Sequence, residues 1–345
     1  MLKDTISKLK EGINLSEKEM MDSLDNIMTG KVSDSLLASF LTAMTIKGET
    51  IDEITGGAKV LRIKADKMNL DDLDTMDTCG TGGDGSGTYN ISTATSLVIA
   101  AAGIDVVKHG NRSVSSRCGS ADVLEALGAN IGLTKSQSES MVRDIGICFL
   151  YAPKYHQAMK HVASVRRELG FRTIFNILGP LANPANTKVQ IMGVYDESIT
   201  EKIAHVLNNL GVKRALVVHG KDGLDELTIT SASKITELNN DTIKTYEINP
   251  EDYGLRRAHM DDIVGGTAKE NAEIITNILK GEQGSRRDIL VLNAGAAIYI
   301  AGKAKSIGHG IDIASDMIDS KKALMKLQKY VDYSNKFKGE DLNGR

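Results

Sequence analysis

Five glycines crowd the eight residues 80–87, which read GTGGDGSG. Glycine adopts positive φ without steric cost and lets a ligand approach the backbone closely. Asn90, Ser92 and Thr93 follow, and because these residue types cap helices, the apolar run up to Ala102 is predicted to be a helix. A loop of free N–H groups that leads into a helix N-terminus binds anions. The pattern predicts a phosphate site, since a purely structural turn needs fewer glycines.

Two other nucleotide-binding motifs use similar loops. Gly80, Gly82 and Gly85 match the G-x-G-x-x-G fingerprint, which needs an apolar strand before it and an acidic residue ending the next strand. The preceding LDDLDTMDTC is acidic and poorly apolar, and Asp105 opens the next predicted strand instead of ending it. A Walker A loop fails as well, because no Gly-Lys-Ser/Thr closes the motif. Phosphate binding of another kind is therefore expected.

Asp84 is a carboxylate in the middle of a predicted anion site. It would repel a bare phosphate, and more strongly as water is excluded. Its charge suits sugar hydroxyls, a metal ion or a developing cation. The alternative is that Asp84 only closes an Asx turn.

A second polar group follows the predicted strand IDVVKHG (104–110). Cations and hydroxyls at the C-terminal end of a parallel strand lie where open α/β sheets bind ligands. Lys108 and the serines of this segment can hold phosphate oxygens through charge-assisted hydrogen bonds. We rank Lys108 and Asn111 before Arg112 and Arg117, because arginines in loops are usually solvated. His109 is as readily a satisfied loop histidine as a ligand contact.

Asp225 and Glu226 are adjacent carboxylates that follow the predicted strand RALVVHG (214–220). Magnesium is commonly bound through one or two carboxylates together with substrate phosphates and water. Alone, such a pair is usually a solvated turn, but beside a phosphate site on the same sheet edge it indicates a metal–diphosphate site. No Ser/His/Asp order, H-E-x-x-H motif or thiol–histidine pairing is evident. Positioning and charge stabilisation are therefore expected to carry the chemistry.

The elements that must position these groups change in character near residue 70. Before it, Ser16 with Glu19 and then Thr50 begin amphipathic runs, and Gly48 ends another, so this part is predicted to be helical. Beyond Asp77, β-rich runs alternate with helical ones, which indicates a mainly parallel sheet flanked by helices. We expect an α/β protein with a small all-helical domain (1–70, joined by helices near 154–185), a large α/β domain (71–335) and a polar tail (336–345).

Composition narrows the class of partner and the compartment. The 345 residues carry a net charge of -3, so there is no basic excess to favour nucleic acid. Cys79, Cys118 and Cys148 are isolated, which fits free thiols in a reducing cytoplasm better than disulfides or zinc. The N-terminus lacks an apolar signal core, and the longest apolar stretch, 97–102, is far too short to span a membrane.

Four stretches in this order resemble the anthranilate phosphoribosyltransferase family: DTCGTGGDGSGTYNIST, KHGNRSVSSRCGSADVLEALG, VRRELGFRTIFNILGPLANP and GLDEL. The resemblance runs from the N-terminal helices to about residue 335. Tyr89 and Cys118 are small departures from the family pattern. The family's fold is nucleoside phosphorylase-like, with the helical domain hinged to the α/β domain. The resemblance implies transfer of the phosphoribosyl group of 5-phosphoribosyl 1-pyrophosphate (PRPP) to the amine of anthranilate, in tryptophan biosynthesis.

The resemblance also implies roles for individual residues. The residues expected to hold PRPP are Gly80, Gly83, Asp84, Thr88, Asn90, Ile91, Ser92, Thr93, Lys108, Ser116 and Ser120. Mg²⁺ would be held by Ser92, Asp225 and Glu226, and anthranilate by Gly80, Asn111 and Arg166. Without the family, Arg166 would be one solvated arginine in a basic helix. A homodimer through the helical part is implied as well, and association with anthranilate synthase subunits stays open.

Two alternatives share this architecture. A pyrimidine nucleoside phosphorylase also handles a ribose and a phosphate, but needs no arginine for an aromatic carboxylate and no metal pair. A non-catalytic nucleic-acid-binding relative should be basic and degraded in the glycine loop, whereas this chain is slightly acidic and its loop is intact.

Overall fold

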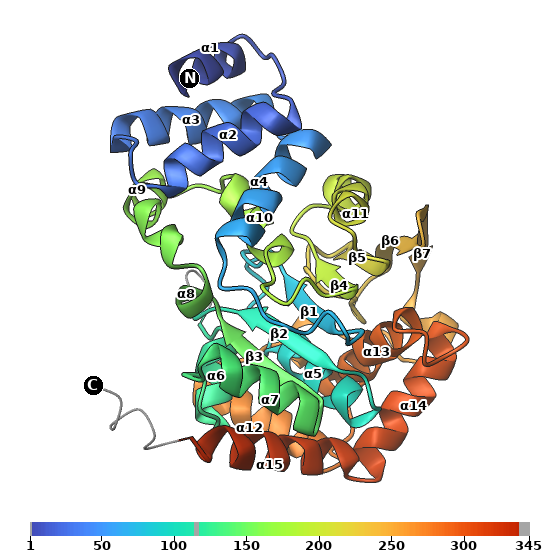
Figure 1. Cartoon of the computed structure of the whole chain (residues 1–345). Coiled ribbons are helices and arrows are strands. Elements are labelled where there is room, and N and C mark those ends of the chain that lie inside the picture. The colour runs from blue at the N-terminus through green and yellow to red at the C-terminus, as the bar shows by residue number, and fades with distance from the viewer. Residues whose placement is uncertain (1, 114–116, 338–345) are drawn as a thin grey trace.

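The computed structural model describes residues 2–113 and 117–337. Its N-terminal part is a group of four helices, in blue at the top of Figure 1. They are α1 (Leu2–Lys10), α2 (Glu17–Met28), α3 (Asp34–Lys47) and α4 (Ile51–Lys64). Reciprocal capping boxes begin α2 at Ser16 and α4 at Thr50, and Gly48, with φ 82°, ends α3. The local signals in the sequence therefore placed these helix ends correctly.

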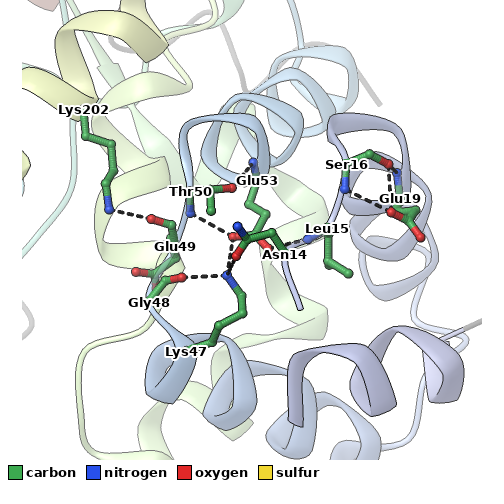
Figure 2. Close-up of polar contacts among 10 residues, drawn as sticks. All are labelled: Asn14, Leu15, Ser16, Glu19, Lys47, Gly48, Glu49, Thr50, Glu53 and Lys202. Atoms are coloured by element: carbon green, nitrogen blue, oxygen red, sulfur yellow. Dashed lines mark hydrogen bonds and ion pairs between the residues drawn. The ribbon is translucent and has the colours of Figure 1, made fainter. Parts of the chain in front are cut away.

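A buried carboxylate holds the helical group together, as Figure 2 shows. Glu53 Oε1 accepts a hydrogen bond from Leu15 N at 2.8 Å. Glu53 Oε2 accepts from Thr50 N at 2.8 Å and forms an ion pair with Lys47 Nζ at 2.8 Å. The side chain of Lys47 is 5% exposed and that of Glu53 0%, so the pair is screened little by solvent. Glu53 thus ties α4 to the end of α3 and to the connection before α2.

Seven strands form one sheet in the order β3-β2-β1-β4-β5-β6-β7. The first five strands in this order are parallel to one another. Strands β6 and β7 extend the sheet beyond β5 as an antiparallel hairpin. Their bounds are β1 (Met76–Gly80), β2 (Val106–Gly110), β3 (Ile147–Tyr151), β4 (Val189–Gly193), β5 (Arg214–Gly220), β6 (Ser233–Asn239) and β7 (Thr242–Ile248). The α/β fold with a mainly parallel sheet and a small helical domain is confirmed.

Strand β1 bears on the sequence analysis, which found the stretch before the glycine loop too acidic and too poor in apolar residues for the strand of a dinucleotide fingerprint. This strand, MDTCG, is the middle one of the five parallel strands and lies in the interior of the sheet, between β2 and β4. Its polar residue Asp77 is fully buried because partners surround it: His109 N donates at 3.2 Å and Asn183 Nδ2 at 2.8 Å. Burial still raises the pKa of Asp77 to about 6, against the attraction of Lys108. A polar strand can therefore occupy the interior of a sheet when distant residues satisfy it.

Two hydrophobic clusters cover the two faces of the sheet. One contains the helices α5 (Ile91–Ala101), α6 (Ser120–Ala126), α7 (Lys135–Ile145), α12 (Ala268–Leu279), α13 (Ser285–Ile300), α14 (Ile307–Asp319) and α15 (Lys322–Asn335). The other joins α11 (Thr200–Asn209), α9 (Ala163–Leu169) and α10 (Ile174–Leu181) to the four N-terminal helices. None of the helices in residues 2–113 and 117–337 is both long and apolar enough to cross a membrane.

Short segments complete the chain and link the two parts. Helix α8 (Ala152–Tyr155) and the 3₁₀ turn η1 (Gln157–His161) lead from β3 up to α9, the green path in Figure 1. Further 3₁₀ turns are η2 (Glu197–Ile199), η3 (Pro250–Tyr253) and η4 (Met260–Ile263). Buried Arg62 on α4 donates to Leu181 O at 2.7 Å and Leu210 O at 3.1 Å. Lys202 on α11 donates to Glu49 O at 2.5 Å (Figure 2). The helical group is therefore tied to the sheet's helices at both Arg62 and Glu49.

Candidate active site

The topology directs attention to the C-terminal ends of β1 and β4. The chain runs outward from β1 through β2 to β3, then returns to the other side of β1 as β4. In open α/β sheets, ligands bind at such a switch point, outside the carboxyl ends of the strands. The glycine loop leaves β1 at this place, and Thr81 N donates to Gly193 O at 3.0 Å, at the end of β4. The predicted phosphate loop therefore lies where the fold favours a ligand.

Four glycines of the loop adopt the left-handed backbone conformation that the sequence analysis expected. Gly82, Gly83, Gly85 and Gly87 have φ of 65°, 74°, 73° and 64°. Residues with a Cβ rarely adopt this conformation, so the glycines are needed for the path of the loop. Gly80 is required for another reason: a Cβ there would lie 2.5 Å from Asp225 Oδ2.

The start of α5 differs in detail from the sequence prediction. Asn90 stands at the N-cap position but makes no side-chain cap. Its amide instead donates to Cys118 O at 3.2 Å and accepts from Asn271 Nδ2 at 2.9 Å. The prediction of Asn90 as a capping side chain is therefore wrong, because two distant segments take both of its hydrogen-bonding groups. Thr93 is fully buried, and its Oγ1 has no partner among the described residues.

Lys108 lies inside the site, in β2, with its side chain buried. Its ammonium group donates to Thr78 O and to Ser92 Oγ, the latter at 3.1 Å. Burial lowers the pKa of Lys108, while the charges of Asp77 and then of Glu226 act in the opposite direction. The lysine thus holds the end of β1 and the first turn of α5 together, and supplies positive charge beneath them.

Three carboxylates, those of Asp84, Asp225 and Glu226, lie near enough to one another beside the loop for their charges to interact. Asp225 Oδ2 accepts from Gly82 N at 2.7 Å, and Asp225 N donates to Asp84 Oδ2 at 3.4 Å. Burial, followed by the charge of Asp84, raises the pKa of Asp225 to about 8. Burial and then the charge of Asp225 raise the pKa of Glu226, which also accepts a hydrogen bond from Ser92 N. The carboxylates of this cluster therefore repel one another.

This donor set fits a hard divalent cation. Buried carboxylates that repel each other are stabilised when a cation is placed between them, and Mg²⁺ takes oxygen ligands from few protein groups. No group of three or more metal-binding His, Cys, Asp or Glu side chains is found in the described part of the chain. A metal here would need further oxygens from substrate or water, which is the usual coordination of Mg²⁺ bound to a diphosphate.

Asp84 shows both properties considered for it from the sequence. Its Oδ1 accepts from Ser86 N at 3.2 Å and its Oδ2 from Ser86 Oγ at 2.7 Å, which is an Asx turn. At the same time its charge acts on Asp225 and on Glu226. Asp84 therefore shapes the loop and adds to the negative charge of the cluster.

The second loop is only partly described. Ser116, which the family resemblance assigns to PRPP, lies outside the described residues. Asn111 is exposed, and its Oδ1 accepts from Arg112 N at 2.8 Å. Arg112 pairs with Asp122 and Glu125 at the surface, as expected for a loop arginine.

Three other residues assigned to PRPP lie near the ends of these loops. Ser120 begins α6 beside Gly110, where an added Cβ would be 3.2 Å from Ser120 Cβ. Thr88, just after the glycine loop, forms an isolated bridge with Val264. Ile91 is buried in the first turn of α5.

Arg166 and two histidines lie on or beside the connection to the helical domain. The Arg166 guanidinium stacks over the Phe175 ring at 5.3 Å, and no hydrogen bond or ion pair of this side chain occurs in the described part of the chain. Burial lowers its pKa. The rings of His109 and His156 lie 5.0 Å apart, and the Nε2 atoms of both are buried without a partner among the described residues. Because the Arg166 guanidinium stacks on Phe175 and is partly buried, it is less solvated than a surface arginine.

Sequence reasoning missed three residues that support the loops. Arg172 donates to Gly83 O and stacks over the Tyr195 ring at 4.4 Å. Tyr195 N in turn donates to Thr81 Oγ1 at 3.0 Å. Asn271 binds the side chain of Asn90. Arg172 stood within a quoted motif, but Tyr195 and Asn271 lie in stretches that carry no phosphate-binding pattern.

Comparison with known proteins agrees with this arrangement. Residues 72–324 match the family described as the glycosyl transferase family a/b domain, and residues 3–65 match its helical bundle domain. The anthranilate phosphoribosyltransferase of Acetivibrio thermocellus is 56% identical over 339 residues, covering 98% of this chain and 98% of that protein. The enzyme of Methanobrevibacter smithii is 50% identical over 335 residues, covering 97% of this chain and 100% of that protein.

Solved structures give the same result. The crystal structure of anthranilate phosphoribosyltransferase from Thermus thermophilus superposes with a TM-score of 0.91 at 39% identity, covering 96% of this chain and 99% of that one. The Saccharomyces cerevisiae enzyme in complex with PRPP and Mg gives a TM-score of 0.89 at 26% identity, covering 97% and 98%. With both domain types present in the same order and high identity over nearly its whole length, the chain belongs to the anthranilate phosphoribosyltransferase family.

Proposed function

We propose that this chain transfers the phosphoribosyl group of PRPP to the amine of anthranilate, giving N-(5-phosphoribosyl)anthranilate and pyrophosphate, in tryptophan biosynthesis. The observation that carries the proposal is the meeting of the glycine loop, the start of α5 and half-buried Asp225 and Glu226 at the switch point of the sheet. This combination suits a diphosphate with a divalent cation. Family membership supports anthranilate as the acceptor.

The diphosphate and ribose of PRPP would bind along the glycine loop and the first turn of α5. The loop offers backbone N–H groups in a left-handed path, and the helix N-terminus favours negative charge. The hydroxyl of buried Thr93, which has no partner among the described residues, can donate to a ligand oxygen. The proposed set is Gly80, Gly83, Asp84, Thr88, Asn90, Ile91, Ser92, Thr93, Lys108, Ser116 and Ser120. Asn90 belongs to this set through its backbone, because its amide is already bound.

Ser92, Asp225 and Glu226 would hold Mg²⁺. When bound, the ion supplies positive charge that neutralises the diphosphate. Two features support this set: the mutual repulsion of the carboxylates, and the hydrogen bond from Ser92 N to Glu226 that places the serine beside them. Lys108 places its ammonium group next to Ser92.

The chemistry is a displacement at C1 of the ribose. The amine of anthranilate forms the new N–C1 bond, the C1–O bond to pyrophosphate breaks, and its electron pair leaves with pyrophosphate. The amine then releases a proton. Lys108 and the α5 N-terminus stabilise the leaving group electrostatically, and the charge of Asp84 suits the oxocarbenium-like carbon. An aromatic amine is already a nucleophile, so we assign no general base.

Anthranilate would be held by Gly80, Asn111 and Arg166. Arg166 has the chemistry to bind a carboxylate, because its guanidinium is largely desolvated and has no carboxylate partner among the described residues. Its place on α9, in the connection between the two parts of the chain, allows domain closure to bring it over the acceptor and exclude water.

A homodimer through the helical part is also proposed. A groove of about 490 Å³ between α1 and α3 is lined by Ile6, Leu9, Ala38, Ala43 and Ile46, among others. Ile46 is 81% exposed, which is unusual for a large apolar side chain on a helix. Light scattering should give twice the chain mass for the wild type and a single mass for Ile46→Asp.

The test is consumption of fluorescent anthranilate by the purified chain with PRPP and Mg²⁺. Asp225→Asn and Glu226→Gln should lower turnover, and higher Mg²⁺ should restore part of it. Absence of turnover by the wild type would overturn the proposal. Wild-type rates for both variants at low Mg²⁺ would show instead that the carboxylate pair is structural. Phosphorolysis of a pyrimidine nucleoside serves as the assay for the competing function.

A further inference from the structure

A buried amide on α12 connects the segments that surround the proposed PRPP site. Asn271 lies in the first turns of that helix, and only 1% of it is exposed. None of the glycine, lysine or carboxylate motifs contains it. A buried primary amide must find partners for its oxygen and its nitrogen, so the identity of those partners is informative.

Both ends of this amide are engaged. Gly266 N donates to Asn271 Oδ1 at 2.7 Å, and Asn271 Nδ2 donates to Asn90 Oδ1 at 2.9 Å. Because a backbone N–H can only donate, the Gly266 contact sets which end of the amide is the oxygen, and the nitrogen must face Asn90. The thiol of Cys118 also forms a hydrogen bond with Asn271.

The hydrogen-bond partners of Asn271 belong to different segments around the proposed PRPP site. Asn90 immediately precedes α5, and its own Nδ2 donates to Cys118 O at 3.2 Å, at the far end of the second loop. Gly266 follows Gly265, whose N donates to Gly87 O at 2.9 Å in the glycine loop. One side chain therefore joins the glycine loop, the start of α5 and the second loop.

The approach of this segment to the site is close. A Cβ on Gly265 would lie 2.6 Å from both Asn271 Oδ1 and Tyr89 Cα. The backbone of Tyr89 is therefore in contact with the Gly265–Gly266 turn just before α5 begins. Because the packing leaves no space here, a shift of Asn271 would be transmitted to both loops.

We infer that Asn271 is a positioning residue for PRPP: it touches no substrate but holds Asn90, and through it the α5 N-terminus and both loops, in the arrangement that binds the diphosphate. The inference rests on the proposed function of this site. Without the amide nitrogen of Asn271, the Asn90 side chain can rotate, and the loops lose their common attachment. PRPP affinity should fall, while the anthranilate subsite should not change.

The experiment compares Asn271→Asp with Asn277→Asp. An ionised aspartate keeps the acceptor for Gly266 N but cannot donate to Asn90, so the change removes one hydrogen bond at nearly constant shape, and the assay is run at a pH high enough to ionise the buried carboxyl. Asn277 lies on the same helix and is exposed, which makes its variant a matched control for the added charge. The Kd of PRPP with Mg²⁺ is measured by calorimetry without anthranilate, and kcat and both KM values are measured separately.

We expect Asn271→Asp to raise the Kd and the KM for PRPP about tenfold, as one lost hydrogen bond predicts, with the KM for anthranilate within twofold. Asn277→Asp should match the wild type. In a double-mutant cycle, Asn90→Ala and Asn271→Ala should be strongly non-additive, because one residue acts through the other. If Asn271→Ala does not fold, the Asp and Asn90 variants still test the inference.

Three results would overturn it: an unchanged Kd for PRPP in Asn271→Asp, additive effects in the cycle, or equal rises in both KM values together with a lowered Tm, as general destabilisation would cause. Failure of the proposed function would look different. The wild type would then show no turnover, but calorimetry would still measure PRPP binding and its dependence on Asn271.

Discussion

The substitution Gly80→Ala should displace the Asp225 carboxylate with little damage to the fold. An added Cβ would lie 2.5 Å from Asp225 Oδ2, whereas ordinary contacts begin at 3.4 Å, so the oxygen must move by about 0.9 Å. The φ of Gly80 is outside the left-handed region, and alanine therefore adds no backbone strain. The movement breaks the 2.7 Å hydrogen bond from Gly82 N to Asp225 Oδ2.

The size of the effect follows from that bond. With Mg²⁺ bound the Asp225 carboxylate would be ionised, and a hydrogen bond to a charged group contributes about 1.5–3 kcal/mol, which corresponds to roughly ten- to a hundredfold in affinity. In the proposed site, the half-saturating Mg²⁺ concentration should rise by about that factor, because a displaced carboxylate no longer meets the ion. Turnover should recover in part at high Mg²⁺, since the charge itself is retained.

The assay follows anthranilate fluorescence during Mg²⁺ titration at saturating PRPP. Gly308→Ala on α14 is the matched control, because its added Cβ would make only an ordinary contact, 3.7 Å from Tyr253 Cδ1. The control should keep the wild-type Mg²⁺ dependence. A Gly80→Ala enzyme with wild-type Mg²⁺ dependence would refute the assignment of Asp225 to the metal. Equal losses in both variants would point to a general effect of removing glycine.

Three further predictions concern the acceptor, pH and stability. Arg166→Ala should raise the KM for anthranilate at least tenfold more than the KM for PRPP. The control is Arg167→Ala, because Arg167 is exposed. A larger rise in the KM for PRPP would instead assign Arg166 to PRPP. Burial lowers the pKa of His109 to about 3 and of His156 to about 4. Between pH 6.5 and 4 the unfolded chain therefore binds more protons than the folded one. The free energy of unfolding should decrease as the pH is lowered through this range, by up to about 1.4 kcal/mol per pH unit per histidine. When the free energy of unfolding is measured by urea at each pH, its slope against pH should be shallower for His156→Phe than for the wild type, and an unchanged slope would contradict this. Glu53→Ala removes the carboxylate partner of the buried Lys47 ammonium, which keeps only the neutral acceptors Asn14 Oδ1 and Gly48 O, and leaves two backbone N–H groups without their acceptor. The change should cost about 3–5 kcal/mol in thermal unfolding, whereas a loss under 1 kcal/mol would show that water replaces the carboxylate.

Local features were predictable because their causes are local. The capping boxes at Ser16 and Thr50, the stop at Gly48 and the left-handed glycines of the loop depend on residues within one or two turns of each other. The strand–helix alternation likewise predicted a mainly parallel sheet. The motifs that resemble the family lie in contiguous stretches, so the order of the loops along the chain could be recognised before any fold was known.

Tertiary structure decided what depends on distant partners. Strand β1 looks too polar to be buried, yet Asn183, more than a hundred residues away, satisfies Asp77 in the interior of the sheet. Asn90 has the residue type of a cap, but Asn271 and Cys118 occupy its amide. Such pairings leave no periodic signal in the sequence, because each partner is chosen by the packing of separate elements.

The glycine loop shows both contributions. The sequence by itself predicted that residues 80–87 follow a left-handed path suited to an anion, and the φ values of its glycines confirm the path, since only glycine adopts it at low cost. Only the fold brought Asp225 to Gly82 across 143 positions of sequence, and burial together with the charge of Asp84 raised the pKa of that carboxyl to about 8. Composition determines which groups are present, whereas desolvation and proximity, which determine their charge and reactivity, arise when the chain is packed.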